Sequence, residues 1–516
     1  MILSDIYERN ARLWPRRTAY ECDGRRITNA EFLARLNRLA NAMAGIERQE
    51  RVAILASNRI EYVEVQAACE RAGFIAVGIN TRLAEPEIAA ILADCLPCAL
   101  FFESKYANLA DQLRVKRPEI RRLVAIGGAP AWAEAYEDLL AAASDATPRA
   151  RAVPTDVAHL IYTSGTTGRA KGVMLSHAAL LQGAQMTAHD GGALPTDRIL
   201  LVMPLFHIGA KIEQLAFSLA GATILFHGSF DTSAVLRAIQ SERVSALHLA
   251  ATLLTRLMND PQFGQVDLSA VRCVHYSASP IALPLLRKAL AAFGPVLVQI
   301  YGMTECPVGT ILKPHQHVAD GDELQTARLA STGQEFFKTQ VRVVGPDGSD
   351  CAQGEIGEIL ISSPASFDGY WQSPEATQEA LRDGWLHTGD MGFQDAERFL
   401  FLADRKKDMI ISGGENIYSR EVEDVLRQHP AVADAAVIGV PDEQWGEVAK
   451  AYIVLNADSA DCEASLIQHC KTLLARYKCP RSFEFVKEIP RTPPLGKIDK
   501  KALRAPHWKG RTRFIS

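Results

Sequence analysis

Residues 162–172 of the chain have the sequence YTSGTTGRAKG. The stretch combines Ser and Thr hydroxyls, glycines and one lysine between apolar flanks. Glycine lets the backbone turn tightly and bring its N–H groups close to an oxyanion. Lys171 adds a point charge, so these residue types predict a cradle for a polyphosphate. We expect the cradle between a strand ending near Tyr162 and a helix around Ala178–Gln182, where phosphate loops occur.

This stretch differs from the Walker A loop. That pattern needs Gly directly before the Lys and Ser or Thr directly after it, whereas Ala170 and Gly172 occupy these positions here. The alternative is a flexible Ser/Thr/Gly linker. Linkers do not usually carry a lysine and apolar flanks, so the phosphate loop is favoured.

The length and composition indicate a globular protein with more than one core. At 516 residues, two or more domains are expected. The net charge of −4 gives no electrostatic footprint for nucleic acid. The N-terminus has no signal-peptide pattern, and the apolar run Ile199–Phe206 is too short to span a bilayer. We therefore expect a cytoplasmic protein without an integral membrane segment; whether it forms a homo-oligomer is left open.

The ten cysteines are scattered through the chain. Cys95 and Cys98 form a single C-x-x-C without a second pair, which is typical of structural cysteines in a reducing compartment. Cys306 has no activating neighbour in the sequence, so it is not expected to be a nucleophile.

Apolar patterns along the first part of the chain alternate between strand and helix. A hairpin is expected around Asp23-Gly24, and Thr28 and Glu31 form a capping box that begins a helix. The expected elements are the strands Thr18–Cys22, Arg25–Thr28, Arg51–Leu55 and Ala99–Phe102 and the helices Arg59–Arg71 and Glu85–Asp94. This alternation predicts an α/β fold with parallel sheet.

The pattern changes after Pro346. Strands at Glu358–Ile361 and Phe399–Leu402 suggest a β-rich lobe, and the charged run Asp404–Asp408 is a plausible boundary. The remainder has its own βα pattern, with strands Ala435–Val440 and Ala449–Val454 and helices Ser419–His429 and Ala464–Arg476. The predicted class is α/β: a large N-terminal domain of parallel-rich sheets with helices and a β-rich lobe, then a small α+β C-terminal domain.

Further polar motifs follow apolar strands. Tyr301–Glu305 places an aromatic ring that could stack on a purine beside a carboxylate that could hold Mg²⁺. Asp390 could accept from ribose hydroxyls, with Arg405 able to reach the same nucleotide. Lys497 lies on a Pro/Gly-rich loop. Taken singly, these motifs are weak evidence. The alternatives are a strand that ends in a turn for Tyr301–Glu305, an ordinary Asp turn for Asp390 and a solvated lysine for Lys497.

In this order and spacing, the motifs resemble the acyl-adenylate-forming superfamily, which includes acyl-CoA synthetases, peptide-synthetase adenylation domains and beetle luciferases. The resemblance covers essentially the whole chain. It is carried by residues 163–171, Pro204–His207, Tyr301–Glu305, Trp385–Asp390, Asp404–Asn416 and Gly496-Lys497. The segment Gly78–Leu83 also resembles the CoA-ligase branch.

The resemblance implies an ATP-dependent ligation of a fatty or aromatic acid to coenzyme A. The carboxylate attacks the α-phosphorus to give acyl-AMP and pyrophosphate, and the CoA thiolate then displaces AMP. ATP, Mg²⁺ and coenzyme A are the implied cofactors, and a small-molecule carboxylic acid is the implied partner. It also implies an N-terminal adenylation domain over residues 1–404 and a mobile C-terminal domain over 405–516, with a hinge near Lys407.

The resemblance assigns roles to matching residues. It implies that the β and γ phosphates of ATP are bound by Thr163, Ser164, Gly165, Thr166, Thr167, Gly168 and Lys171. It implies that adenine is bound on one side by Tyr301, Gly302 and Thr304. On the other side it is bound by the segment Ser277–Pro280, which includes Ala278 and Ser279. Asp390 and Arg405 bind ribose, Glu305 serves Mg²⁺ with Thr163 or Thr304, and Lys497 bridges the substrate carboxylate and the α-phosphate.

The remaining assignments concern the acid and the thiol. Gly413 and Gly414 close the pantetheine tunnel, His207 gates thiol access, and the CoA nucleotide falls to Trp445 and Tyr477. The expected acyl pocket is lined by His207, Lys211, His248, Tyr276 and Met303. Lys211 either pairs with a distal carboxylate or hydroxyl of the acid, or turns to solvent or to a neighbour such as Glu213.

The chain departs from the family pattern at three places. Ala170 replaces a usual Pro, Ser277–Pro280 replaces a Gly-rich segment, and the loop 492–495 before Lys497 is one residue longer than usual. His207 stands where peptide synthetases have an Asp for an α-ammonium group, so an α-amino acid is not expected. The alternatives are an enzyme that loads a separate carrier protein, a nucleotide-binding regulatory protein, or a luciferase-type oxygenase.

Overall fold

The computed structural model describes residues 1–149, 151–163, 170–277, 281, 283–405, 408–412, 415–442, 445–456, 463–474, 476–492 and 497–509. They form two compact units: Met1–Val341 with Ile361–Leu386, and Arg342–Leu360 with His387–Ser516. These borders fall inside three strands and differ from the expected boundary at residue 405. The expected boundary at residue 405 separates two domains that are proposed to move relative to each other. It stays a prediction.

The first sheet of the N-terminal unit has nine strands in the order β16-β15-β14-β13-β12-β10-β11-β1-β2. Its centre is parallel, and antiparallel pairs close both edges. The bounds are Thr18–Cys22 (β1), Arg25–Thr28 (β2), Arg198–Leu201 (β10), Thr223–Phe226 (β11), Ala246–Ala250 (β12), Cys273–Ser277 (β13), Leu297–Met303 (β14), Cys306–Leu312 (β15) and Gln334–Glu335 (β16).

The second sheet has eight strands in the order β19-β9-β8-β4-β3-β5-β6-β7. Strands β8 to β7 along this order are parallel, whereas β9 pairs antiparallel with both β8 and β19. The bounds are Arg51–Leu55 (β3), Ile75–Gly78 (β4), Ala99–Glu103 (β5), Arg122–Ile126 (β6), Glu134–Ala135 (β7), Val157–Thr163 (β8), Lys171–Ser176 (β9) and Gly369–Tyr370 (β19). The predicted parallel α/β architecture and its hairpin are confirmed.

Helices cover both sheets of the N-terminal unit. They are α1 (Ser4–Leu13), α2 (Asn29–Ala42), α3 (Ile60–Ala72), α4 (Glu85–Cys95), α5 (Ala107–Lys116), α6 (Tyr136–Ala141), α7 (His177–Asp190), α8 (Ile208–Ala220), α9 (Thr232–Ser241), α10 (Ala251–Met258), α11 (Leu283–Phe293), α12 (Glu323–Ala327) and α13 (Pro374–Ala380). The predicted capping box is present, because Thr28 and Glu31 bond reciprocally at the start of α2.

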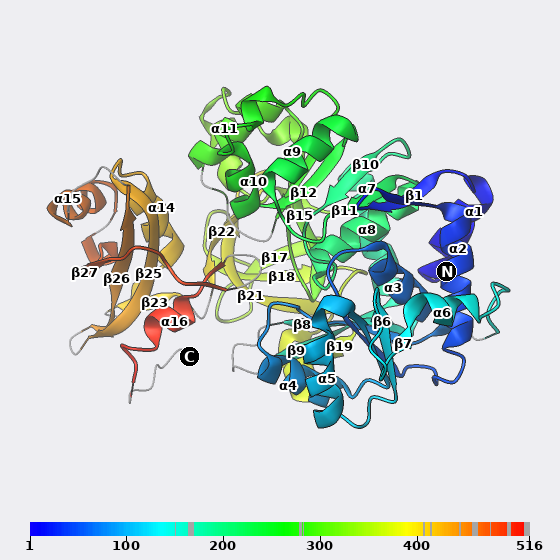
Figure 1. Cartoon of the computed structure of the whole chain (residues 1–516). Helices are drawn as coiled ribbons and strands as arrows, with labels where there is room; N and C mark the ends of the chain where they lie inside the picture. Colours follow the sequence, from blue (N-terminus) through cyan, green and yellow to red (C-terminus); the bar gives the residue numbers. More distant parts are fainter. Residues whose placement is uncertain are drawn as a thin grey trace. The chain divides into compact units, whose positions relative to one another are not determined.

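Two of these helices, α3 and α8, lie between the sheets (Figure 1). Every residue of α3 is buried, so the helix lacks the polar face of a surface helix. Helix α3 contacts β3 and β4 of one sheet and β1 of the other. Helices α4 and α5 pack on the outer face of the second sheet, while α9, α10 and α11 pack on the outer face of the first.

The β-rich lobe predicted after Pro346 is a third sheet in the order β17-β18-β21-β20, with β22 paired to β21. Its strands are Gln340–Val344 (β17), Gly357–Ser362 (β18), Leu381–Arg382 (β20), Trp385–Gln394 (β21) and Leu400–Arg405 (β22). The borders of the two units fall within β17, β18 and β21.

The C-terminal unit contains a mixed sheet in the order β24-β23-β26-β25, with β27 beside β26, and the small hairpin β28–β29. The bounds are Ile410–Ser412 (β23), Glu415–Ile417 (β24), Val432–Asp442 (β25), Gly446–Leu455 (β26), Ser482–Phe485 (β27), Arg491–Thr492 (β28), Lys497–Ile498 (β29), Ser419–Arg427 (α14), Glu463–Leu473 (α15) and Lys500–Arg504 (α16).

Strand β25 divides its side chains between two apolar clusters. Ala435 and Val437 pack with α14 and α15, whereas Ala436 and Ile438 pack with Leu503 of α16. Successive side chains of a strand point to opposite faces, so this alternation buries both faces of the sheet. The predicted βα pattern of the C-terminal stretch is confirmed.

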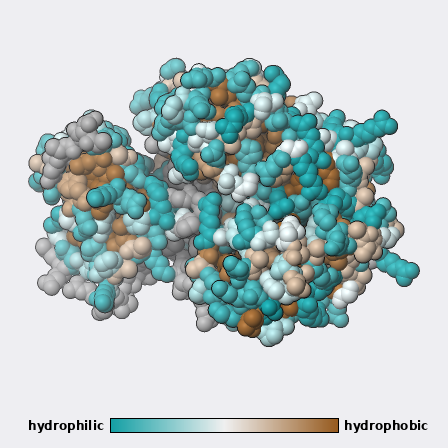
Figure 2. Space-filling model, in the orientation of Figure 1, coloured by the Kyte–Doolittle hydropathy of each residue, from teal (hydrophilic) through white to brown (hydrophobic). Residues whose placement is uncertain are grey.

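The outer surface contains no large apolar face in the view of Figure 2, where hydrophobic residues form small separate patches among hydrophilic ones. No helix in the described ranges is both long enough and apolar enough to cross a bilayer. None of the nine described cysteines forms a disulfide.

A buried ion pair joins the two inner helices. Lys211 of α8 is 0% exposed, and its ammonium lies 2.7 Å from the carboxylate of Glu70 on α3. Burial alone would raise the pKa of Glu70, but the charges of Lys211 and His159 outweigh it and lower that pKa to about 2. The Glu70 carboxylate also accepts from Tyr7 of α1 and bonds His159 of β8. One buried group thus connects four elements.

Removing one partner of this pair should destabilise the N-terminal unit. We expect Glu70→Gln to lower the free energy of unfolding by about 3–5 kcal/mol, because it leaves the Lys211 ammonium without a counter-charge. Urea denaturation followed by fluorescence would measure this. The double variant Glu70→Gln/Lys211→Met should recover much of the loss. Equal stability of Glu70→Gln and the unaltered chain would contradict the role of the pair.

Candidate active site

The predicted phosphate loop connects two antiparallel strands. Thr163 ends β8 and pairs directly with Lys171, the first residue of β9. The expected strand before the loop and the expected helix around Ala178–Gln182 are confirmed as β8 and α7. The strand β9, which lies between the loop and α7, was not expected from the sequence. At the described base of the loop, Thr163 and Lys171 are strand residues, so Lys171 could supply charge to a phosphate held there.

The motif Tyr301–Glu305 forms the end of β14 and the tight turn into β15. Met303 pairs with Cys306, which places Thr304 and Glu305 in the turn. A Cβ on Gly302 would lie 2.4 Å from the carbonyl oxygen of Pro307, so only glycine fits there. Burial raises the pKa of the Cys306 thiol, in agreement with its predicted inertness.

Tyr370 of β19 brings the lysine and the carboxylate of these two motifs together. Its hydroxyl donates to Oε1 of Glu305 at 2.7 Å, and the Nζ of Lys171 lies 4.8 Å from the centre of its ring. Strand β19 pairs with β9, which fixes this position. Sequence analysis missed Tyr370, because nothing in the local sequence shows that residue 370 pairs with residue 173.

His207 caps the N-terminus of α8. Its backbone carbonyl accepts from the N–H of Lys211 at 3.1 Å, and its N–H donates to Pro204 at 3.0 Å. Its ring packs on that of Phe206, with centroids 4.6 Å apart. Since α8 is anchored by the ion pair of Lys211, the position of His207 follows from the burial of that helix.

The structure does not support Lys211 as a substrate-pocket residue. Its ammonium donates to Gln66 and Gln214 and pairs with Glu70, which uses all three N–H groups. Solvent exposure is equally wrong, and Glu213 pairs with His275 instead. The sequence could not reveal this, because Glu70 lies far away along the chain.

The other expected pocket residues lie near the ends of adjacent strands. His248 is on β12 and Tyr276 on β13, both buried, and Met303 ends β14 half-buried. The hydroxyl of Tyr276 bonds Gln299 and His317. The carboxyl ends of adjacent parallel strands are where α/β proteins place their ligands.

Other predicted nucleotide residues belong to the C-terminal unit. Asp390 of β21 is buried, and its backbone pairs directly with that of Arg405 on β22. Lys497 is exposed at the start of β29, opposite Thr492. Both motifs thus place a charged residue on a strand.

Two aromatic residues expected to contact CoA lie exposed on the same unit. Trp445 is 37% exposed, with the guanidinium of Arg481 5.6 Å from its ring. Tyr477 is 44% exposed, with Lys478 near its ring. An exposed ring beside a cation suits a phosphorylated nucleotide.

Several predicted residues lie outside the described part of the chain. They are Ser164, Gly165, Thr166, Thr167, Gly168, Ala278, Ser279, Lys407, Gly413 and Gly414. The longer loop before Lys497 also falls there.

The residues present fit a Mg²⁺ ion that is held mainly by phosphate. In the described ranges, no group of three or more His, Cys, Asp or Glu residues could hold a metal. Glu305 offers one buried carboxylate, and Mg²⁺ is commonly bound by one or two carboxylates together with substrate phosphates.

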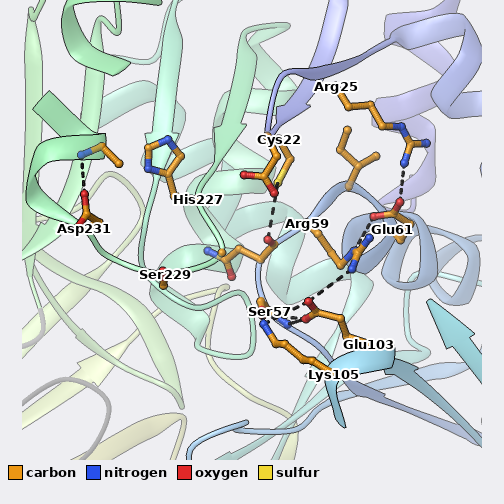
Figure 3. Close-up of a pocket in the computed structure, with 15 residues that line it drawn as sticks. Cys22, Arg25, Ser57, Arg59, Glu61, Glu103, Lys105, His227, Ser229 and Asp231 are labelled. Atoms are coloured by element: carbon orange, nitrogen blue, oxygen red, sulfur yellow. Dashed lines mark hydrogen bonds and ion pairs between the residues drawn. The ribbon is translucent and has the colours of Figure 1, made fainter. Parts of the chain in front are cut away.

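A separate cleft of about 530 Å³ lies in the N-terminal unit (Figure 3). Its cations are already paired: Arg25 and Arg59 with Glu61, and Lys105 with Glu103. Because carboxylates neutralise these cations, the cleft is not suited to bind an anion. It contains none of the predicted catalytic residues.

The chain matches two family models. Residues 7–371 match the AMP-binding enzyme family, and residues 421–494 match the AMP-binding enzyme C-terminal domain. Indoleacetate–CoA ligase of Aromatoleum aromaticum is 38% identical over 512 residues, 98% of each chain. Feruloyl-CoA synthase of an Amycolatopsis species is 38% identical over 96% of this chain and 97% of the relative.

A solved structure shares the whole architecture. It is the amide bond synthetase McbA from Marinactinospora thermotolerans, which superposes with a TM-score of 0.88 at 30% identity. The match covers 98% of this chain and 99% of that one.

Removing the hydroxyl of Tyr370 should weaken the site without unfolding it. Tyr370→Phe keeps the ring beside Lys171 but loses the bond to Glu305, a charge-assisted bond worth about 1.5–3 kcal/mol. We expect at least a roughly tenfold loss in ATP–pyrophosphate exchange and a higher half-saturating Mg²⁺ concentration. Unchanged Mg²⁺ dependence would show that Tyr370 does not position Glu305. Tyr370→Leu should be worse than Tyr370→Phe, because it also removes the ring.

Proposed function

Because the chain belongs to the AMP-binding enzyme family and is an AMP-forming acid–thiol ligase, we propose that it activates an aromatic carboxylic acid with Mg²⁺ and ATP and transfers it to coenzyme A. The observation that carries the site proposal is the meeting of Lys171 and Glu305 at Tyr370. The aromatic class is supported by the indoleacetate and feruloyl substrates in the names of two relatives.

In the first step, an oxygen of the carboxylate attacks the α-phosphorus of ATP. The bond from that phosphorus to the bridging oxygen breaks, and pyrophosphate leaves. We propose that Lys171 and Thr163, with Ser164, Gly165, Thr166, Thr167 and Gly168, hold the leaving phosphates. Bound Mg²⁺ would neutralise phosphate charge, with Glu305 and Thr163 or Thr304 as its protein ligands. The step thus needs positioning and charge neutralisation rather than covalent catalysis.

In the second step, the CoA thiolate attacks the acyl carbonyl, and the bond to AMP breaks. We propose His207 as the residue that gates thiol access, Gly413 and Gly414 as the wall of the pantetheine tunnel, and Trp445 and Tyr477 as nucleotide contacts. Tyr301, Gly302, Ala278 and Ser279 would hold adenine, while Asp390 and Arg405 would hold ribose. The cytoplasmic location expected from the sequence stays a prediction.

Lys497 is proposed to act only in adenylation. Lys497→Ala should reduce pyrophosphate exchange by about 10²-fold or more, because the developing charge at the α-phosphorus loses its counter-charge. Thioester formation from preformed acyl-AMP should be spared. Separate rate measurements of the two half-reactions would test this. An equal loss of rate in both would reject the assignment.

The proposed hinge near Lys407 predicts the opposite pattern. Lys407→Pro fixes φ at residue 407 and should slow thioester formation while leaving adenylation nearly intact. Single-turnover measurements of each half-reaction would test it. Normal thioester formation in Lys407→Pro would remove the hinge.

The decisive experiment for the function is pyrophosphate release with a panel of carboxylic acids, with and without coenzyme A. The second candidate is an enzyme that adenylates an acid for another acceptor, a carrier protein or, as the similarity to an amide bond synthetase suggests, an amine. AMP release that depends on coenzyme A favours the ligase. Acyl-AMP that is released only by an amine or a carrier favours the alternative.

A further inference from the structure

Two buried polar atoms beside α8 have no hydrogen-bond partner among the described residues. They are Nδ1 of His248 and Oε2 of Glu213. His248 is 2% exposed and Glu213 1% exposed. An unpartnered buried donor or acceptor costs stability, so two of them in one region call for an explanation.

His248 lies between the first turn of α8 and the end of β13. Its Nε2 bonds the hydroxyl of Ser277 at 2.8 Å. Its Cε1, the ring atom between the two nitrogens, would lie 3.2 Å from a Cβ on Gly209. The ring therefore lies against the turn that begins at His207, on the proposed acyl side of the site.

Glu213 is an ionised carboxylate held at one oxygen only. Its Oε1 lies 2.7 Å from Nδ1 of His275, whose Nε2 lies 3.0 Å from the carbonyl oxygen of Gly191. Both acceptors require a donor, so both nitrogens of His275 carry protons and the ring is an imidazolium. Burial alone would raise the pKa of Glu213, but the charge of His275 outweighs it and keeps that pKa low. Oε2 can therefore only accept.

His248 and Glu213 belong to one polar group. His248 pairs in register with His275 on the neighbouring parallel strand, so the two rings share a face of the sheet. Gly209, which His248 contacts, lies four positions before Glu213 on α8, so both lie on the same face of that helix. Burial lowers the pKa of His248, so its ring is neutral beside the anionic Glu213.

We infer that His248 and Glu213 select acids that carry a neutral hydrogen-bond donor, a phenolic O–H or a ring N–H, on the part remote from the carboxylate. The inference rests on the proposed function and adds the substrate class. A hydrogen-bond donor on the acid would satisfy Oε2 of Glu213. An acid with a second, distal carboxylate is disfavoured, because its negative charge would be repelled by the Glu213 anion. This excludes the dicarboxylic acids that an inward Lys211 would have favoured.

Matched pairs of acids test the inference on the unaltered enzyme. The first pair is indole-3-acetate and benzofuran-3-acetate, which differ by N–H against O. The second pair is 4-hydroxycinnamate and 4-methylcinnamate, which are similar in shape. We expect kcat/KM for pyrophosphate release to favour the donor-bearing acid at least about tenfold in one pair or both, because a site built for a donor is left unpaired by its isostere.

Variants then locate the selectivity. His248→Phe keeps a ring of similar size without nitrogens, so the ratio of kcat/KM within the preferred pair should fall. Glu213→Gln should also reduce the ratio, although the charge of His275 would then be uncompensated. His189→Phe is the matched control, because His189 is 67% exposed at the end of α7 and should keep the ratio.

The outcomes separate this inference from the proposed function. Pyrophosphate release with equal efficiency for both members of both pairs would overturn the inference and leave the ligase standing. A preference that survives both His248→Phe and Glu213→Gln would also overturn it and would indicate that a buried water satisfies these atoms. Failure of every acid to release pyrophosphate would remove the proposed function and the inference together.

Discussion

Helix α8 is held between two sheets by two buried ion pairs. In one pair the helix supplies the cation, and in the other it supplies the anion. Lys211 reaches across to Glu70 of α3, and Glu213 reaches back to His275 of β13. The two residues are two positions apart, so they leave the helix in different directions. A buried charge that loses its counter-charge is strongly destabilising, so each of these two charges must keep its partner. This requirement fixes the depth and rotation of α8, and with them the place of its cap, His207.

The phosphate side of the proposed site depends on strand pairing rather than on a helix. The loop after Thr163 lies between two antiparallel strands, and the turn at Glu305 lies in a second sheet. Tyr370, delivered by a short edge strand, links the two through its ring and its hydroxyl. Lys171 pairs with Thr163 at the base of the loop, so its charge lies close to the position proposed for the phosphates.

Local pattern was sufficient for many elements of the fold. The hairpin around Asp23-Gly24, the Thr28 capping box and the strand Arg51–Leu55 have the predicted bounds or differ by little. Their signals are turn residues, a cap and an apolar run, all of which lie within a few residues of one another. The helix expected around Ala178–Gln182 is part of α7. The strand Lys171–Ser176 before it was not foreseen, because its partners on both sides are supplied by the sheet.

By itself, the sequence determined which chemistry the chain carries. The Ser/Thr/Gly loop with Lys171, the Tyr301–Glu305 motif and Lys497 are weak signals one by one, and their order and spacing along the chain identify the family. Only the tertiary structure decided which charges are already used. Lys211 is compensated by Glu70, 141 positions earlier, whereas one oxygen of Glu213 and one nitrogen of His248 remain without partners among the described residues. Pairing over such separations depends on how the sheets and helices pack, which no local pattern contains.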